Sequence, residues 1–327
     1  MKKRSRGAAL LTAMLTVALV ATFAAAALWQ QWRSIEVETA ERARVQSAWI
    51  LTGALDWARL ILREDRNGID HLGEPWAVPL QEARLSSFLA ADRNTTTESG
   101  PEVLEAFLSG QVIDLQSLLN VNNLLEADGK LSKEGLESFE RLFEVLGLPQ
   151  AELERMAENL RFASDTSAGN RSSPMAPLRP QRVAQLVWLG LSAQTVATLQ
   201  PYITILPGRT PVNLNTASAE VIYASAHQLS MADAQVLVAE RERAPFKTNS
   251  DAYKLLPGGA PVLAQGQFDV GVASRFFEIR ARLRLDELVV EERSVLQRSA
   301  PGGKVTVLDR ERGIVDPTTL SQAAAKR

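Results

Sequence analysis

The chain has 327 residues, a formal net charge of −2 and no cysteine. The lack of cysteine excludes disulfide frameworks, thiol catalysis and cysteine-ligated zinc, so stability must come from packing even in an oxidising compartment. The length exceeds what a single small domain needs, which predicts a second globular unit.

The N-terminal segment combines a short basic leader with a long apolar run. Four basic side chains lie within residues 1–7, and the next charged residue is Arg33. From Ala8 to Leu28 the chain has 21 residues, which as a helix span roughly 31 Å, long enough to cross the hydrocarbon core of a bilayer. The N-terminus is therefore predicted to be a membrane element.

Two ordinary interpretations of this segment remain open. A secretory signal peptide could be cleaved at the small residues Ala24–Ala26, although its apolar core usually has only about 7 to 15 residues. A retained signal anchor would have its N-terminus in the cytoplasm, because the basic residues Lys2, Lys3, Arg4 and Arg6 precede the apolar run.

A third interpretation rests on the residues that follow the apolar run. No Gly or Pro occurs from Ala8 to Thr52, so no residue obliges the helix to end at the membrane surface. Farther along, apolar residues recur at helical spacing: Ile50, Ala54, Trp57 and Ile61. We therefore predict one helix over residues 8–63 that is both membrane stem and domain spine.

A basic leader ending in Gly7, an apolar run starting at Ala8 and a long continuous helix resemble the type IV prepilin class, which includes the type II secretion pseudopilins. The resemblance implies that a prepilin peptidase cuts between Gly7 and Ala8 on the cytoplasmic side. Loss of the leader (residues 1–7) removes four basic side chains, so the formal charge moves from −2 to −2 − 4 = −6. Methylation of the new N-terminus at Ala8 is left open.

One residue departs from the usual pattern of the class. Most pilins carry Glu as the fifth mature residue, where it is thought to pair with the N-terminal amine of a neighbouring subunit, but here that residue is Thr12. A lone carboxylate in hydrocarbon is costly, so its presence implies a partner. Lack of this Glu is typical of the K-type minor pseudopilin, which the resemblance places at the filament tip.

The segments after the stem differ in their patterns. Residues 64–112 are interpreted as the loop-rich first part of a β domain, and residues 113–260 as an inserted helical domain. Within the insertion, one helical face is apolar: Leu136, Phe139, Leu142, Phe143 and Leu146. The Ser- and Pro-rich Ser164–Pro180 segment is predicted to be an exposed loop.

The C-terminal part has the alternation of a half-buried strand. Phe277, Ile279, Ala281, Leu283 and Leu285 alternate with charged residues. Residues 261–316 are therefore predicted to form an antiparallel meander, followed by a tail at 317–327. The fold class is α+β: a transmembrane and spine helix, a pilin-like antiparallel sheet and a large inserted all-α domain.

This order of segments resembles the K-type minor pseudopilin of the type II secretion system. Four local segments resemble it as well: Asp70–Pro75, Asp114–Gln116, Asn120–Leu124 and Pro211–Ala217. The resemblance implies a non-enzymatic subunit of the bacterial inner membrane, with a periplasmic domain, that initiates and caps the pseudopilus. The implied partners are the I- and J-type minor pseudopilins, the major pseudopilin, the prepilin peptidase and the inner-membrane assembly platform.

A DNA-binding receptor is the alternative, because residues 213–258 resemble a helix-hairpin-helix module. Such hairpins use two glycines to bring backbone N–H groups close to a phosphate, and Gln228 and Ser230 stand at those places here. Basic residues do not outnumber acidic ones in the mature chain, whereas duplex binding draws on a basic surface. We therefore expect no nucleic-acid partner.

Neither a metal site nor a catalytic site is expected from the residues. Asp128–Leu131 resembles the middle of an EF-hand loop, but Leu124 and Gly135 fall where oxygen ligands are required, so a turn with Ser132 as helix N-cap is preferred. Calcium stays open through the family resemblance, and no other cofactor is expected. His71 and His227 lie in separate regions, and Glu291 and Glu292 alternate across a strand and so face opposite sides.

Overall fold

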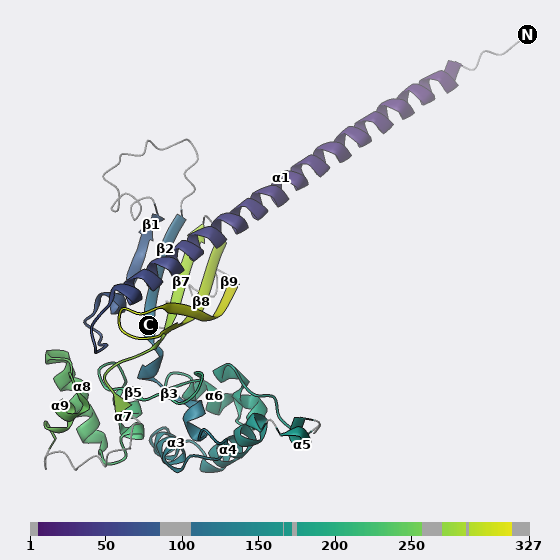
Figure 1. Cartoon of the computed structure of the whole chain (residues 1–327). Coiled ribbons are helices and arrows are strands. Elements are labelled where there is room, and N and C mark those ends of the chain that lie inside the picture. The colour runs from purple at the N-terminus through teal and green to yellow at the C-terminus, as the bar shows by residue number, and fades with distance from the viewer. Residues whose placement is uncertain are drawn as a thin grey trace, which may run out of the picture.

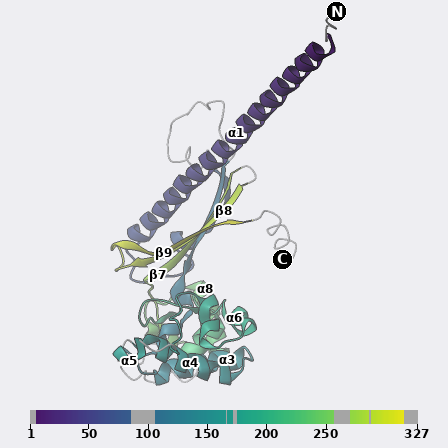
Figure 2. The same cartoon turned by 90° about the vertical axis from the view of Figure 1, so that its right-hand side faces the viewer.

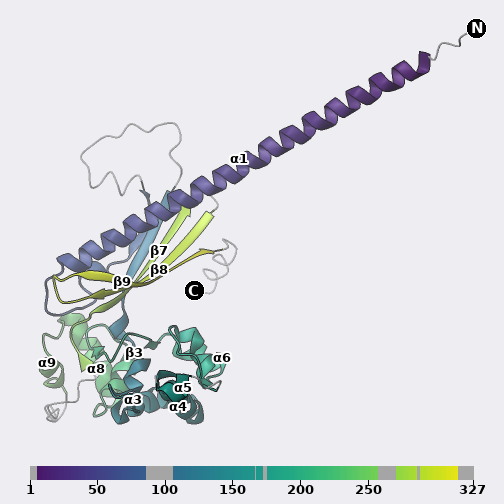
Figure 3. The same cartoon turned by 45° about the vertical axis from the view of Figure 1, so that its right-hand side comes forward.

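The computed structural model describes residues 6–85, 106–165, 167–171, 175–256, 270–285 and 288–315. A single long helix carries an antiparallel sheet against its C-terminal part, and a helical domain follows beyond the sheet (Figure 1). The side views place the helical domain at the end of the molecule opposite the N-terminus of the helix (Figures 2 and 3).

Helix α1 runs without interruption from Arg6 to Glu64, as the lack of Gly and Pro between Ala8 and Thr52 predicts, and it continues through Gly53. Its second half packs on the sheet through Leu51, Leu55, Ala58 and Leu62, which repeat at helical spacing and are buried. From Ala9 to Arg42 its residues are exposed. By length and composition, α1 is the one helix among the described residues that could cross a membrane.

The main sheet has five antiparallel strands in the order β1-β2-β7-β8-β9. Their bounds are Leu80–Arg84, Ala106–Asp114, Phe276–Leu285, Leu288–Arg298 and Val305–Val315. The predicted alternation in β7 is correct, since Phe277, Ile279, Ala281, Leu283 and Leu285 are all buried and most of them pack with residues of α1.

Residues 64–112 were predicted to be rich in loops, and strand β2 shows that this prediction is wrong for their last part. It is a nine-residue strand in the interior of the sheet, pairs with β7 over its whole length and continues to Asp114. The polar run Ser109-Gly110-Gln111 interrupts the apolar alternation by which a strand is recognised. Its partner lies far away in the sequence, so pairing rather than local pattern stabilises it.

The helical domain lies between β2 and β7. Its helices are η2 (Leu115–Ser117), η3 (Val121–Leu124), α3 (Lys133–Val145), α4 (Gln150–Ser164), α5 (Ala168–Arg171), η4 (Val183–Leu189), α6 (Ala193–Leu199), α7 (Ala219–Ser225), α8 (Met231–Arg243) and α9 (Asn249–Tyr253). In α3, Phe139, Leu142 and Phe143 are fully buried, which agrees with the apolar face read from the sequence. Outside this domain, the short helix η1 (Pro75–Ala77) lies between α1 and β1 and packs on the sheet.

Two predicted segments differ in the structure. Ser164–Pro180 is not loop throughout, because the one-turn helix α5 interrupts it and the buried Asn170 donates to the carbonyls of Phe162 and Asp165. The helical domain also extends past residue 260. Strand β6 (Val270–Gly271) pairs with β5 (Val212–Asn213) and belongs to its core, just as β3 (Leu119–Asn120) pairs with β4 (Ile203–Thr204). The predicted tail, 317–327, lies outside the described residues.

Gly135 in α3 gives a stability test, because a Cβ there would lie 2.0 Å from the carbonyl oxygen of Asn123. We expect Gly135→Ala to destabilise the protein by about 2–4 kcal/mol, since the obstacle is backbone that must move. Thermal unfolding of the full chain in detergent measures the change.

The matched control is Gly53→Ala in α1, where a Cβ would meet nothing within 4 Å. This variant should gain roughly 0.5–1 kcal/mol from helix propensity. Equal unfolding temperatures for the two variants would contradict the close approach of α3 to η3.

Candidate functional site

The predicted processing site lies at the start of α1. Gly7 and Ala8 are helical and directly follow Arg6, the first helical residue. Thr12 lies one turn farther on, and its hydroxyl donates to the carbonyl oxygen of Ala9 at 3.0 Å. The Thr12 hydroxyl therefore has its acceptor within the helix itself, whereas a carboxylate at the same position, which only accepts hydrogen bonds, would need a donor or a positive charge from another chain.

The first half of α1 presents a continuous apolar surface. Large apolar side chains from Leu10 to Leu28 are more than half exposed, and Trp29 and Trp32 follow at the end of the run. Tryptophan is enriched where a membrane meets water. The burial of this surface must come from lipid or from other helices, so α1 anchors the protein in a membrane.

Three of the four segments that resemble the K-type pattern, Asp70–Pro75, Asp114–Gln116 and Pro211–Ala217, converge where the sheet joins the helical domain. At the centre is Asp114, the last residue of β2, which is almost fully buried. Its carboxylate accepts hydrogen bonds from the Gln116 backbone N–H, the Asn213 side-chain amide and the hydroxyls of Thr216 and Ser274. Burial raises the pKa of Asp114, and these four hydrogen bonds act against the shift.

A buried arginine completes the junction. Arg298 at the end of β8 donates to Asp65 at 2.6 Å, to Asp70 at 2.5 Å and to the carbonyl oxygen of Ser274. Asp70 also accepts from the Ser274 backbone N–H. Burial raises the pKa of Asp70 to about 6, against the opposing effects of Ser274 and Arg298. The end of α1, the end of β8 and the return from the helical domain are thereby held together.

Three asparagines form a second set of contacts within the helical domain. Asn120 accepts from the Leu206 backbone N–H and donates to Gly208, Asn122 donates to the Leu206 carbonyl oxygen, and Asn123 both donates to and accepts from the Thr210 backbone. These side chains substitute for backbone partners along the 206–210 loop. The repetition of Asn in the sequence was the only sign of this role.

The carboxylates of Asp65, Asp70 and Glu74 lie close enough together to suggest a metal site. However, the Arg298 guanidinium already contacts Asp65 and Asp70. Glu74 accepts from the Trp76 indole N–H at 2.6 Å and from the His71 backbone N–H. Internal donors therefore account for this cluster, which fits an ion-pair network rather than a cation site.

The hairpin of α7 and α8 does not offer the phosphate site that the DNA-binding alternative requires. The carboxylate of Asp233 accepts from the Ser230 backbone N–H and caps the N-terminus of α8. On the other side, Arg141 of α3 donates to three carbonyl oxygens at the turn, those of Tyr223, His227 and Leu229. The turn is held against α3, and a phosphate would meet the Asp233 carboxylate.

The structure brings His227 of the hairpin together with two neighbouring residues of α3, Glu137 and Ser138. His227 Nε2 lies 2.8 Å from the Ser138 hydroxyl and Nδ1 lies 3.2 Å from the Glu137 carboxylate. Ser138 is 1% exposed, so a substrate cannot reach its hydroxyl. The group joins α3 to the hairpin and is not arranged for nucleophilic catalysis. His71 lies elsewhere, with Nδ1 accepting from the Gly73 N–H.

Two further sequence interpretations can be compared with the structure. Ser132 caps α3 by accepting from the Gly135 N–H, as expected. The preceding turn has Gly129 at φ 81° and a bridge between Leu125 and Leu131, which makes it a tight turn. Glu291 pairs with Arg282 on one face of the sheet, while the buried Glu292 pairs with Arg310 and Arg312 on the other.

The raised pKa of Asp70 predicts a pH dependence of stability. The folded state binds the proton of the Asp70 carboxyl group more tightly than the unfolded chain does. This proton therefore stabilises the folded state fully below about pH 4, and the stabilisation is lost as the pH rises through about 6. The group's contribution over this window is about 3 kcal/mol. Asp70→Asn should therefore flatten the pH profile of the unfolding free energy, measured by tryptophan fluorescence in detergent.

The control for this measurement is Asp56→Asn, which changes an exposed carboxylate of α1 and should leave the wild-type slope intact. Asp70→Asn also removes one of the two carboxylates that contact Arg298, and this loss applies only where Asp70 is ionised, above about pH 6. An unchanged slope in Asp70→Asn would show that Asp70 is not the titrating group.

Comparisons with known proteins agree with this architecture. Residues 117–208 and 212–271 match two family models, both described as type II secretion system protein K. A type II secretion system protein K of Pseudomonas aeruginosa is 26% identical over 96% of this chain and 94% of its own length. One from Pectobacterium carotovorum is 25% identical over 96% of this chain and 98% of its own.

A solved structure has a similar fold. A chain in the crystal structure of the GspK-GspI-GspJ complex, from the type 2 secretion system of enterotoxigenic Escherichia coli, matches with a TM-score of 0.62 and 19% identity. The match covers 84% of this chain and 98% of that one. Two adjoining family models and two relatives matched over nearly their whole length agree with one another: the chain is similar to type II secretion system protein K.

Proposed function

We propose that this protein is a minor pseudopilin that initiates the pseudopilus of a type II secretion system and caps its tip. The observation that carries the proposal is the dual role of α1. From Ala9 to Leu28 its exposed surface is uncharged and mainly apolar, and its second half is the spine on which the sheet packs. A subunit built in this way is suited to leave a membrane by packing its stem among other stems.

The position of the helical domain supports the terminal place in the filament. The domain lies beyond the sheet, at the far end of the molecule from the membrane stem (Figure 2). The buried network of Asp114, Asp70 and Arg298 fixes it there. A rigid domain of this width would obstruct the next subunit, so the filament would end at this protein.

Thr12 is consistent with the same place. In the pseudopilin scheme, the fifth mature residue of each new subunit meets the N-terminus of its neighbour, and a subunit at the tip needs no such partner. The Thr12 hydroxyl donates to Ala9 within its own helix. It therefore places no unpaired charge in the hydrocarbon.

The proposed partners follow from the family and from the solved complex. Because the complex with the similar chain contains GspI and GspJ, we propose that the I- and J-type minor pseudopilins join this protein in a tip complex. The major pseudopilin would extend the filament from below, and the inner-membrane platform would supply the drive. Nothing in the proposed role requires catalysis or a cofactor from this chain, and a calcium ion in the helical domain is left to measurement.

The proposed topology places the N-terminus in the cytoplasm and the folded domain in the periplasm. The four basic residues of the leader lie on the cytoplasmic side, in keeping with the positive-inside rule. The membrane would be the bacterial inner membrane. A prepilin peptidase acting between Gly7 and Ala8 would remove the same four charges after insertion.

Processing of the N-terminus tests this proposal. In cells that contain a prepilin peptidase, the mature protein should begin at Ala8, and without the peptidase it should keep the leader. Gly7→Val should block the cut, because a branched side chain replaces the hydrogen next to the bond that the peptidase must approach. Mass spectrometry of the purified N-terminus reads out each case.

Lys3→Gln is the matched control, since it alters the leader but leaves the Gly7–Ala8 junction intact and should be processed normally. A mature N-terminus near Trp29 in both strains would indicate a secretory signal peptide. An uncut Met1 in both would indicate a plain signal anchor, and either result would contradict the pseudopilin proposal.

A further inference from the structure

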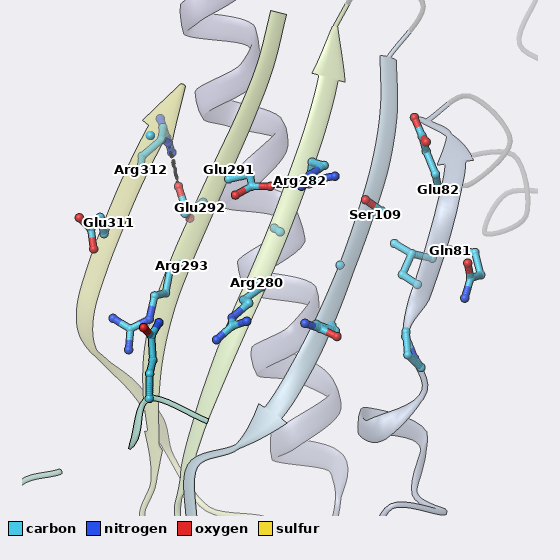
Figure 4. A pocket seen from close by; sticks show the side chains of 17 residues that line it. Gln81, Glu82, Ser109, Arg280, Arg282, Glu291, Glu292, Arg293, Glu311 and Arg312 are labelled. Atoms are coloured by element: carbon cyan, nitrogen blue, oxygen red, sulfur yellow. Dashed lines mark hydrogen bonds and ion pairs between the residues drawn. The ribbon is translucent and has the colours of Figure 1, made fainter. Parts of the chain in front are cut away.

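The face of the sheet opposite α1 forms an open groove with a cavity volume of about 960 Å³. Figure 4 views this outer face, with the helix behind the strands. Apolar contacts between Phe276, Leu115 and Leu206 join the sheet to the helical domain, and Gln200 of that domain lines the groove. Concave surfaces between two domains are preferred places for ligands.

Two arginines lie directly opposite each other in the groove. Arg280 of β7 and Arg293 of β8 are cross-strand partners (Figure 4). Like charges at such positions destabilise a sheet unless something neutralises them. Here a single buried carboxylate does so: Glu278, 3% exposed, accepts from Arg280 Nε at 2.5 Å and from Arg293 Nε at 2.6 Å.

This arrangement leaves donors open toward the groove. Both hydrogen bonds to Glu278 use the Nε groups, while the Arg280 side chain is 59% exposed and that of Arg293 is 38% exposed. Asp309 lies 3.9 Å from a terminal nitrogen of Arg293, which is too far for a hydrogen bond. The terminal amino groups of two guanidiniums thus face the groove from positions fixed by Glu278.

The other arginines on the central strand differ. Arg282 pairs with Glu291, and Arg284 pairs with Glu82 at 2.7 Å. Each of these guanidiniums has a carboxylate of its own. All four arginines lie on the same face. Among them, only Arg280 and Arg293 share a single carboxylate and so keep terminal N–H groups available.

The mixed charge of the face indicates which anion fits. Paired guanidiniums match the planar fork of a carboxylate or phosphate. The groove also contains the carboxylates of Glu82, Glu291 and Glu311, and each is paired with an arginine, so the face lacks the broad positive surface that a nucleic acid or an anionic lipid surface requires. A polypeptide with one carboxylate needs only the Arg280–Arg293 pair, and Ser109 and Gln111 on β2 offer hydrogen bonds to its backbone.

We propose that the outer groove docks an extended segment of a second protein and that Arg280 and Arg293 together bind one carboxylate of that segment. The pair forms a docking site on the face of the sheet turned away from the stem. The proposal does not depend on the processing of the N-terminus, so the two can fail separately.

Photo-crosslinking from the floor of the groove tests the proposal. A photo-reactive residue replaces Ser109 in the full-length protein in its producing cells, and mass spectrometry maps the crosslinked segment. We expect a segment of another protein with an Asp or Glu within a few residues of the crosslink. Crosslinking to lipid, to a segment without a carboxylate, or to nothing would overturn the proposal.

Substitutions establish whether the arginines cause the binding. Arg280→Lys with Arg293→Lys keeps the charge beside Glu278 but removes the planar forks, and the yield of the crosslink should fall at least about fivefold. Arg280→Gln with Arg293→Gln should abolish it, but this pair leaves Glu278 buried without a partner and risks unfolding. The lysine pair therefore decides the question.

Arg282→Lys is the matched control, because it lies on the same strand and face but is paired with Glu291. Its crosslink yield should stay within about twofold of the wild type, as expected for a guanidinium already engaged by its own carboxylate. An equal loss in Arg282→Lys would show that the binding needs no particular arginine, which contradicts the proposed site.

Discussion

The structure depends on the hydrogen bonds and ion pairs around Asp114, Asp70 and Arg298. The chain leaves the sheet at Asp114, forms the whole helical domain and returns to the sheet at Phe276. Ser274 lies just before that return, and it contacts both carboxylates, Asp70 through its backbone N–H and Asp114 through its hydroxyl. Two buried carboxylates without these donors would be costly, so the network forms only when the two domains are in this arrangement.

That constraint connects the local chemistry to the proposed role. A stem helix can transmit a filament's push to the tip only if the parts at the tip are fixed to it. Here the last turn of α1 leads to Asp65, and Arg298 joins Asp65 to Asp70. The helical domain is joined in turn through the side-chain amide of Asn213, which contacts Asp114 and the carbonyl oxygen of Asp70. Stem, sheet and helical domain are thus joined by a continuous set of buried contacts.

The sequence predicted the elements that have a local cause. Most of helix α1 follows from the lack of Gly and Pro between Ala8 and Thr52, and β7 follows from its alternation. Strand β2 was not recognised as an interior strand, because its polar centre hides a pairing with β7 that is more than 160 residues away. The hydrogen-bonding roles of Asp114 and Asn213 were likewise invisible, since the two residues are brought together by the fold. The four segments were noticed as a resemblance, but only the structure gives their physical reason.

Each face of the sheet has a buried carboxylate that binds two arginines. On the face that carries α1, Glu292 binds Arg310 and Arg312, and Arg310 also donates to Thr52 of the helix, so this group helps to seat the stem. On the outer face, Glu278 binds Arg280 and Arg293 in the same two-to-one ratio. Each group thus has a buried carboxylate between two arginines, and in the Glu292 group one arginine also donates to the helix. That contact shows how an arginine of such a group can hold a second element in place, which is the physical reason to regard the Glu278 group as a docking site.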